Sequence, residues 1–223
     1  RGPVSVPKSF LVGMYRNAMK LNKLISRIID FRKLESGKLK LEPQSLNLVA
    51  FCKDLTVDYE ALCQQKNIIF HFLPSRTVIR VEFDPEKMEI LLSNLISNAF
   101  KYTPEGGKIV LSIDETDEKI TLVVEDNGIG IKKEFQDAIF ERFFQVENTE
   151  IFSTGDGIGL SFVKHLVELH DGTIHVESEL NKGAKFIVEL PKKERGDEPV
   201  SSEEGLLPHL LLFRLSIRRI PLS

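Results

Sequence analysis

The 223-residue sequence has no tryptophan, only two cysteines and no excess of positive charge. Thirty Lys and Arg residues stand against 33 Asp and Glu residues, which gives a formal net charge of −3. Nucleic-acid-binding domains usually carry a clear basic excess, so this composition does not favour that class. Any phosphate group that the protein binds must therefore be held by a local site.

The two cysteines, Cys52 and Cys63, fall eleven residues apart within one predicted helix. That spacing puts them on one face but roughly 16 Å apart along the axis, which is too far for a disulfide. Two unpaired thiols, and no signal peptide after Arg1, are typical of a reducing compartment, so we expect a cytoplasmic location. No apolar run approaches the ~20 residues that span a bilayer, and we expect any membrane anchor in another part of a longer parent protein.

The first segment, from about position 9 to 34, shows apolar residues at steps of three and four, which predicts a helix with one apolar face. The face consists of Leu11, Met14, Ala18, Leu21, Leu24, Ile25, Ile28, Phe31 and Leu34. One such helix cannot bury this face by itself, so the pattern favours bundling or dimerisation. We expect residues 1–40 to form this separate helical part, ending at Gly37.

The next part, residues 41–192, mixes helices and strands without strict strand–helix–strand repeats, and this predicts a two-layer α/β sandwich of the α+β class. Asp84 followed by Pro85 is a strong helix start. The expected helices cover 47–65, 85–102, 133–141 and 160–170. The expected strands cover 68–73, 77–83, 108–114, 119–125, 174–178 and 184–190. Residues 193–223 are expected to be a linker and a tail without an assigned role.

On the helix that follows Pro85, the polar residues Asn94, Asn98 and Lys101 lie at positions i, i+4 and i+7. Asparagine is a mediocre helix former, so two of them on one stripe indicate a role for their amide groups. Amide oxygens beside a lysine suit Mg²⁺ or a phosphate group. The plainer interpretation, a solvated helix face, stays open.

Two glycine-rich segments adjoin predicted elements. Asp126 to Gly130 follows an apolar strand, where an Asp can accept from an amine and glycines let a flat base approach the backbone. Gly155 to Leu160 opens a helix, which would point backbone N–H groups at a phosphate. Taken alone, the first segment is better explained as a simple turn, which needs the same residues, and a flexible hinge is the alternative for the second.

Arg142 is the cation of the segment Phe140 to Phe144, and arginine matches phosphate oxygens well. A surface ion pair is its commonest other explanation. The five histidines show no spacing to Cys or acidic residues that would hold a metal.

Taken in this order, the segments 94–104, 126–130, 140–143 and 155–160 resemble the four ATP-site boxes of sensor histidine kinases, above all those of hybrid two-component proteins. Residues 14–39 resemble the second helix of the family's dimerisation and phosphoacceptor domain. The resemblance implies a Bergerat-type fold, a mixed sheet backed by helices, with ATP under a lid at about 145–154.

The resemblance also assigns a contact with the nucleotide to Asn94, Asn98, Lys101, Tyr102, Asp126, Gly128, Gly130, Gly155, Gly157, Gly159 and Leu160. Asn98 would coordinate Mg²⁺, and Lys101 would neutralise phosphate charge. Asp126 would hold the adenine amine, Tyr102 would pack on the nucleotide, and Arg142 would reach the γ-phosphate. The catalytic set implied is therefore Asn98, Lys101 and Arg142.

The implied activity is transfer of the γ-phosphoryl group of ATP to a histidine, and the implied partners are a second copy and the receiver domain of a response regulator. No histidine precedes His71, so the phosphoacceptor is not in this sequence and autophosphorylation is not expected. Two alternatives stay open: a nucleotide-binding regulatory module without catalysis, and a serine kinase of the anti-sigma type.

Overall fold

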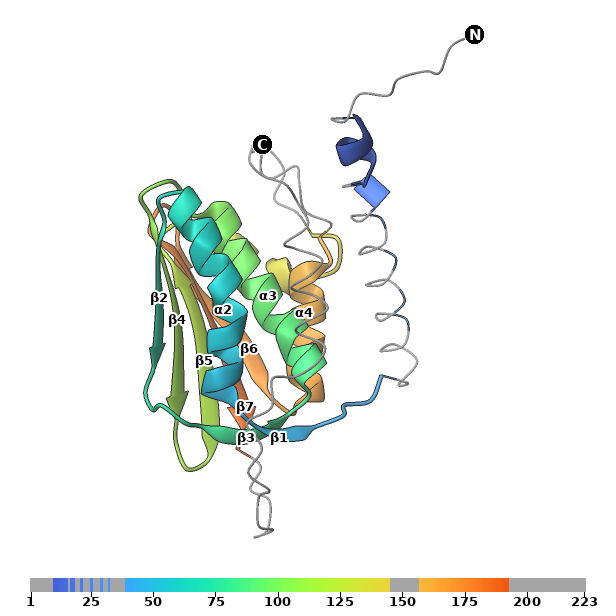
Figure 1. Cartoon of the computed structure of the whole chain (residues 1–223), viewed down its shortest axis with the longest axis vertical. Helices are drawn as coiled ribbons and strands as arrows, with labels where there is room; N and C mark the ends of the chain where they lie inside the picture. The colour runs from blue at the N-terminus through green and yellow to red at the C-terminus, as the bar shows by residue number, and fades with distance from the viewer. Residues whose placement is uncertain are drawn as a thin grey trace. The chain divides into compact units, whose positions relative to one another are not determined.

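The computed structural model describes residues 10–15, 17–18, 21, 25, 29, 32, 39–144 and 157–192. The chain divides into two units, residues 1–193 and 194–223, and all of the described residues belong to the first. Figure 1 shows that the main body of this unit consists of a sheet with helices packed on one face.

The sheet has five strands in the order β2-β4-β5-β7-β6. They are β2 (Ile69–Pro74), β4 (Lys108–Glu115), β5 (Lys119–Asp126), β6 (Thr173–Glu179) and β7 (Gly183–Pro191). β2 pairs with β4 in parallel, whereas the other neighbours are antiparallel. The helices α2 (Leu48–Gln65), α3 (Pro85–Tyr102) and α4 (Gly159–Leu169) cover one face (Figure 1). This mixed, helix-backed sheet confirms the expected α+β fold.

A two-stranded sheet of β1 (Gln44–Asn47) and β3 (Arg80–Phe83) adjoins the main body. The sequence predicted a strand at 77–83, which contains β3, but predicted neither β1 nor this pairing. Asn47 ends β1 and caps α2, because its Oδ1 accepts from the backbone N–H groups of Val49 (3.1 Å) and Ile79 (3.3 Å). One side chain therefore sets both the strand end and the helix start.

The hydrophobic core lies between the sheet and α3 and contains side chains at strand spacing and at helical spacing. Along β4, every second residue, Ile109, Leu111 and Ile113, is 0–1% exposed, as the period of two in a strand requires. The buried face of α3 supplies Met88, Leu91, Leu92, Leu95, Ile96 and Ala99 at helical spacing. Because this face is buried, the polar residues of α3 face away from the sheet.

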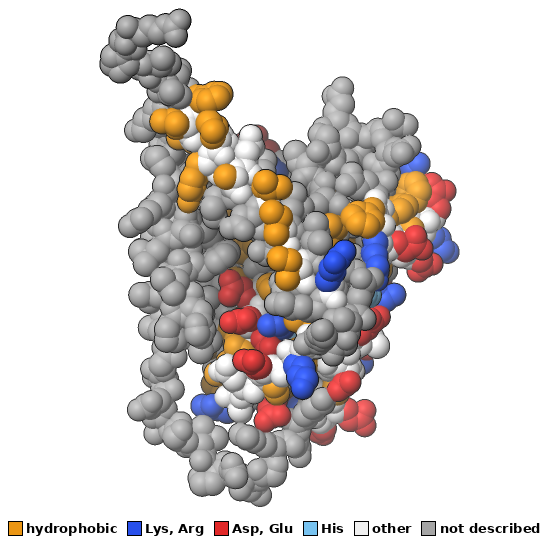
Figure 2. Space-filling view, turned by 90° about the vertical axis from the view of Figure 1, so that its right-hand side faces the viewer, with side chains coloured by type: hydrophobic (Ala, Val, Ile, Leu, Met, Phe, Trp, Pro, Cys, Tyr) orange, Lys and Arg blue, Asp and Glu red, His pale blue; other side chains and the backbone are white. Residues whose placement is uncertain are grey.

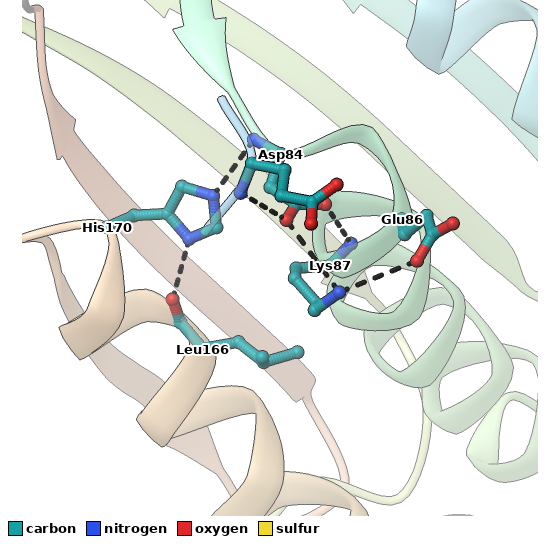
Figure 3. A network of polar contacts seen from close by, with 6 residues as sticks. Asp84, Glu86, Lys87, Leu166 and His170 are labelled. Atoms are coloured by element: carbon teal, nitrogen blue, oxygen red, sulfur yellow. Dashed lines mark hydrogen bonds and ion pairs between the residues drawn. The ribbon is translucent and has the colours of Figure 1, made fainter. Parts of the chain in front are cut away.

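The N-terminal end of α3 is held by Asp84, which is 2% exposed (Figure 3). Its Oδ1 accepts from the N–H of Lys87 (3.1 Å), and its Oδ2 accepts from the N–H of Glu42 (2.9 Å). The N–H of Asp84 donates to Nε2 of His170 (3.3 Å), and Nδ1 of His170 lies 2.7 Å from the carbonyl oxygen of Leu166. The start of α3, the end of α4 and the segment before β1 therefore meet at one buried residue, Asp84.

One predicted helix, 133–141, is wrong. The segment forms two short 3₁₀ turns, Lys133–Phe135 and Ala138–Phe140, whose bonds span three residues, such as that from the N–H of Glu141 to Ala138. The side chain of Gln136 donates to the carbonyl oxygens of Ile131 (3.1 Å) and Ser178 (2.7 Å). The bond to Ser178 holds the segment against β6.

The described positions between 10 and 32 are all helical, as the sequence predicted, and the other positions of that segment lie outside the described residues. Among them, the large apolar side chains of Phe10, Leu11, Met14, Tyr15, Leu21, Ile25 and Ile29 are 47–60% exposed. Figure 2 shows a row of hydrophobic side chains on the surface. Within the part of the chain that the structure describes, no helix has the length and hydrophobicity needed to cross a membrane.

Candidate functional site

The polar stripe of α3 is not a simple solvated face, because Asn94 is only 7% exposed. Its Nδ2 donates to the carbonyl oxygen of Ile90 at 2.7 Å, four residues back in the same helix. Asn98, one turn further on, is half-buried. The side-chain amides of Asn94 and Asn98 are therefore buried to different degrees, as expected where a helix lines a binding site.

Asn94 faces the start of α4. A Cβ atom added at Gly159 would lie 3.0 Å from Oδ1 of Asn94, so the two helices approach closely there. The N-cap residue of α4, Ile158, provides no side-chain cap. The first N–H groups and the positive dipole end of this 11-residue helix therefore lie beside a polar amide, a combination that suits an anion.

The C-terminal end of α3 carries Lys101 and Tyr102, which contact each other. Nζ of Lys101 donates to Oη of Tyr102 at 2.9 Å and lies 4.6 Å from the centroid of its ring. Both side chains are half-buried. The lysine charge and the aromatic ring are thus presented together, one helical turn beyond Asn98.

Asp126 ends β5 with 8% exposure, and its Oδ1 accepts from the N–H of Gly128 at 2.8 Å. Burial raises the pKa of this carboxyl from 3.8 to about 6; the N–H groups of Gly128 and Ala184 lower it, and the charge of Glu125 raises it. No ion pair among the described residues involves Asp126. A buried carboxylate in this state suits a ligand that brings its own N–H donor.

Positions 128 and 130, after Asp126, require glycine, because neighbouring backbone atoms leave no room for a Cβ atom. A Cβ at Gly128 would lie 2.3 Å from the carbonyl oxygen of Tyr102. Gly130 has a φ of +67°, and a Cβ there would lie 2.0 Å from the carbonyl oxygen of Glu179. The loop from Asp126 to Gly130 is therefore clamped between the end of α3 and the β6–β7 turn.

Arg142 lies on the surface, in the segment that precedes residues 145–156. The next residue, Phe143, donates its N–H to the carbonyl oxygen of Gly157 at 2.9 Å. Gly157 has a φ of +66°, and a Cβ there would lie 2.8 Å from Cα of Phe143. The structure thus joins the two ends of the predicted lid, whereas Gly155 and residues 145–154 lie outside the described residues.

One residue of this region, Gly183, was not predicted from the sequence. Gly183 opens β7 with a φ of +99°, and a Cβ there would lie 1.8 Å from the carbonyl oxygen of Asp126. The turn pattern Asn181-Lys182-Gly183 between two predicted strands was a visible signal. Its contact with Asp126 was not visible, because that depends on the pairing of β5 with β7.

The predicted residues therefore gather from three elements: Asn94, Asn98, Lys101 and Tyr102 on α3; Asp126, Gly128 and Gly130 at the end of β5; and Gly157, Gly159 and Leu160 at the start of α4. Among the described residues there is no group of three or more His, Cys, Asp or Glu that could hold a metal. A divalent ion here would depend on an amide oxygen such as that of Asn98 and on oxygens of the ligand.

The chain is similar to known histidine kinases and related ATPases. Residues 83–194 match the family described as "Histidine kinase-, DNA gyrase B-, and HSP90-like ATPase". The catalytic domain of histidine kinase ThkA is 31% identical, with a TM-score of 0.62 over 68% of this chain and 99% of that chain. A structure of ThkA in complex with the response regulator protein TrrA is 25% identical, with a TM-score of 0.65 over 85% of this chain and 53% of that chain.

Curated relatives include "Histidine kinase P4" of Formosa agariphila, 35% identical over 99% of this chain, and "Hybrid signal transduction histidine kinase D" of Dictyostelium discoideum, 34% identical over 82%. This chain spans only 16% and 12% of the length of those two proteins. The chain belongs to the family of histidine kinase-, DNA gyrase B- and HSP90-like ATPases. Within that family it is the ATP-binding catalytic core of a sensor histidine kinase.

Proposed function

We propose that the chain binds ATP together with Mg²⁺ between α3, the loop from Asp126 to Gly130 and the start of α4. The observation that carries this proposal is the buried carboxylate of Asp126, placed at one end of a wall whose other end is Asn94 and the start of α4, which has no side-chain cap. A purine amine at the first end and phosphates at the second match these two chemistries.

In this proposal each side chain has one task. The carboxylate of Asp126 accepts from the adenine amine, and Tyr102 packs on the nucleotide. Lys101 neutralises phosphate charge, the amide oxygen of Asn98 coordinates Mg²⁺, and Asn94 assists at the phosphates. Bound Mg²⁺ supplies charge neutralisation for the phosphoryl group that is transferred. The protein contributes positioning and a low-dielectric surrounding, since this reaction needs little covalent chemistry from it.

Arg142 and the glycines at 155, 157 and 159 complete the proposal. Arg142 would reach the γ-phosphate from the segment before residues 145–156, and the glycines with Leu160 would let that segment fold over the nucleotide. Support comes from the bond between Phe143 and Gly157, which brings the arginine-bearing segment to the start of α4.

The phosphoryl acceptor would be a histidine outside these 223 residues, since none precedes His71. The chain alone is therefore expected to bind ATP without phosphorylating itself. A second copy would associate through residues 9–35, and a receiver domain would take the phosphoryl group onward. The complex of ThkA with the response regulator protein TrrA supports the receiver domain as a partner by similarity. A membrane anchor would belong to the parent protein.

The binding test is a calorimetric titration with a non-hydrolysable ATP analogue, with and without Mg²⁺. Asn98→Ala and Asp126→Asn should each weaken binding by about tenfold or more, as expected for a lost charged or metal contact. Asp117→Asn, an exposed carboxyl in the β4–β5 turn, is the matched control and should bind as the wild type does. A wild-type chain that binds no nucleotide would contradict the proposal.

The reaction test is incubation with ATP labelled at the γ-phosphate. We expect no label on the chain. Acid-labile label would show that a histidine within these residues is an acceptor, and acid-stable label would favour the serine-kinase alternative.

A further inference from the structure

The last carbonyl groups of α3 need partners, because the final turn of a helix has no intrahelical donors for them. The N–H and Oγ1 of Thr103 both donate to the carbonyl oxygen of Ala99, at 3.0 and 2.7 Å. The carbonyl oxygen of Tyr102 accepts from the N–H of Ile129 at 3.4 Å. None of these bonds pairs the carbonyls of Phe100 and Lys101 in the last turn, or that of the C-cap residue Thr103.

Lys66, the residue that follows α2, pairs two of these carbonyls. Its Nζ donates to the carbonyl oxygen of Phe100 at 3.1 Å and to that of Thr103 at 3.0 Å. The same ammonium lies 4.9 Å from the centroid of the Phe100 ring. No ion pair among the described residues involves Lys66, so its charge is directed at the negative end of α3.

Asn67, the residue after Lys66, is also bonded to the turn after α3. The carbonyl oxygen of Asn67 accepts from the N–H of Gly106 at 3.1 Å, and Nδ2 of Asn67 donates to Oε1 of Glu105 at 2.7 Å. Asn67 adopts a φ of 54°, a conformation that few residues other than glycine accept. The turn after α2 is therefore built against the turn after α3.

Movement at the end of α3 would reach the nucleotide site directly. Lys101 and Tyr102 lie between the two carbonyls that Lys66 holds. A Cβ atom added at Gly128 would lie 2.3 Å from the carbonyl oxygen of Tyr102. The end of α3 and the loop after Asp126 are therefore in close contact. The spacing of the lysine, the tyrosine and the carboxylate thus depends on one helix end.

We propose that Lys66 is a positioning residue of the nucleotide site: it fixes the C-terminal end of α3 so that Lys101, Tyr102 and the loop from Asp126 keep the spacing that ATP requires. The inference rests on the proposed function and extends it to a residue that does not touch the nucleotide. Lys66 lies outside all four segments that carry the resemblance to histidine kinases.

The first test compares ATP-analogue binding by the wild type, Lys66→Met, Lys66→Arg and Lys53→Met. Methionine keeps the aliphatic stem and removes the charge and donors, so the dissociation constant should rise by about fivefold to tenfold. Arginine restores a cationic donor and should recover most of the affinity. Lys53, an exposed lysine on the same helix, is the control and should have no effect.

A double-mutant cycle separates positioning from general destabilisation. If Lys66 acts through Lys101 and Tyr102, the combined Lys66→Met and Lys101→Met variant should lose much less affinity than the product of the two single losses. Losses that multiply independently would overturn the inference, as would Lys66→Met binding within twofold of a wild type that binds.

Hydrogen exchange in the nucleotide-free protein gives an independent readout. In Lys66→Met the amides of Thr103 and Ile129 should exchange at least about tenfold faster, whereas that of Leu122 in the centre of the sheet should not change. Unchanged exchange at Thr103 and Ile129 would overturn the inference. A wild type that binds no nucleotide would instead overturn the proposed function and, with it, the nucleotide part of this inference.

Discussion

The carboxylate of Asp126 is 8% exposed at the end of β5, and its burial makes the ionised form costly in the protein without a ligand. Burial raises its pKa from 3.8 to about 6. A carboxyl group with a raised folded-state pKa stabilises the fold while it is protonated. That contribution is complete below about pH 4 and is lost as the pH rises through about 6.

We therefore predict that Asp126→Asn is more stable than the wild type at pH 7.5, by about 1–2 kcal/mol, because the amide is never charged. The gain should shrink towards zero near pH 4. Urea unfolding of both proteins at pH 4.5 and 7.5 measures the difference in the free energy of unfolding. The other titrating groups contribute equally to both proteins and cancel in that difference. The same variant should bind the ATP analogue poorly, so a stability gain with retained affinity would contradict the assigned role.

Gly159 offers a substitution that tests the site without disturbing the fold. A Cβ there would lie 3.0 Å from Oδ1 of Asn94, the end of a side chain that can shift. Gly159→Ala should leave the free energy of unfolding within about 1 kcal/mol of the wild type, because alanine favours the first turn of α4. It should weaken ATP-analogue binding by about tenfold by displacing the Asn94 amide.

Gly13→Ala is the matched control for that variant, since nothing lies within 4 Å of a Cβ at Gly13. It should not change the affinity for nucleotide. Equal affinities of Gly159→Ala and Gly13→Ala would show that the Asn94–Gly159 contact does not contribute to the site.

At the scale of elements, α3 is the helix on which the site depends, and it is held at both ends by part-buried polar contacts. Asp84 receives N–H groups from Lys87 and Glu42 at one end (Figure 3), and Lys66 binds carbonyl oxygens at the other. The N–H of Asp84 also donates to His170 at the end of α4. The two helices that line the site are therefore anchored at one shared point far from it.

Asp84→Ala should lower the free energy of unfolding by about 2–4 kcal/mol, because it removes the N-cap of α3 and leaves the N–H groups of Glu42 and Lys87 without their acceptor. Asp84→Asn keeps one acceptor oxygen and should cost less. Glu86→Gln, whose side chain is 68% exposed, should change stability by less than about 0.5 kcal/mol. Urea unfolding compares the three, and a loss no larger than that of Glu86→Gln would contradict the anchoring role.

Helix starts were predictable from local signals, whereas strand partners were not. Asp84 and Pro85 marked the start of α3 because capping and the ring geometry of proline act within a few residues. The pairing of β1 with β3 and the place of β7 between β5 and β6 join distant parts of the chain. The predicted helix at 133–141 was wrong: the segment forms two 3₁₀ turns, and its bond from Gln136 to the carbonyl oxygen of Ser178 joins distant parts of the chain that local signals do not relate.

At the scale of the whole molecule, the apolar side chains near the N-terminus are the feature that the catalytic domain does not explain. Leu21, Ile25 and Ile29 are 59%, 47% and 48% exposed and recur at helical spacing. Exposed apolar stripes of this kind mark association surfaces. A second copy of the chain is the occupant that we expect.

Light scattering over a wide concentration range should therefore show self-association of the wild type. A double variant, Leu21→Glu with Ile25→Glu, should shift the apparent mass towards the monomer while ATP-analogue binding stays unchanged. Leu73→Glu places one glutamate on an exposed apolar position of β2 and should leave the mass unchanged. A wild type that is monomeric at every concentration would contradict the prediction.

By itself, the sequence determined the α+β class, most helix and strand positions, the spacing that keeps Cys52 and Cys63 from bridging each other and the four segments that carry the ATP-site resemblance. These follow from periodicity, capping and short motifs, which act over a few residues. Only the tertiary structure decided that Asn94 is buried, that Gly128 is confined by Tyr102, that Gly183 contacts Asp126 and that Lys66 holds the end of α3. Each of these depends on contacts between residues brought together only when the sheet has formed and the helices have packed on it.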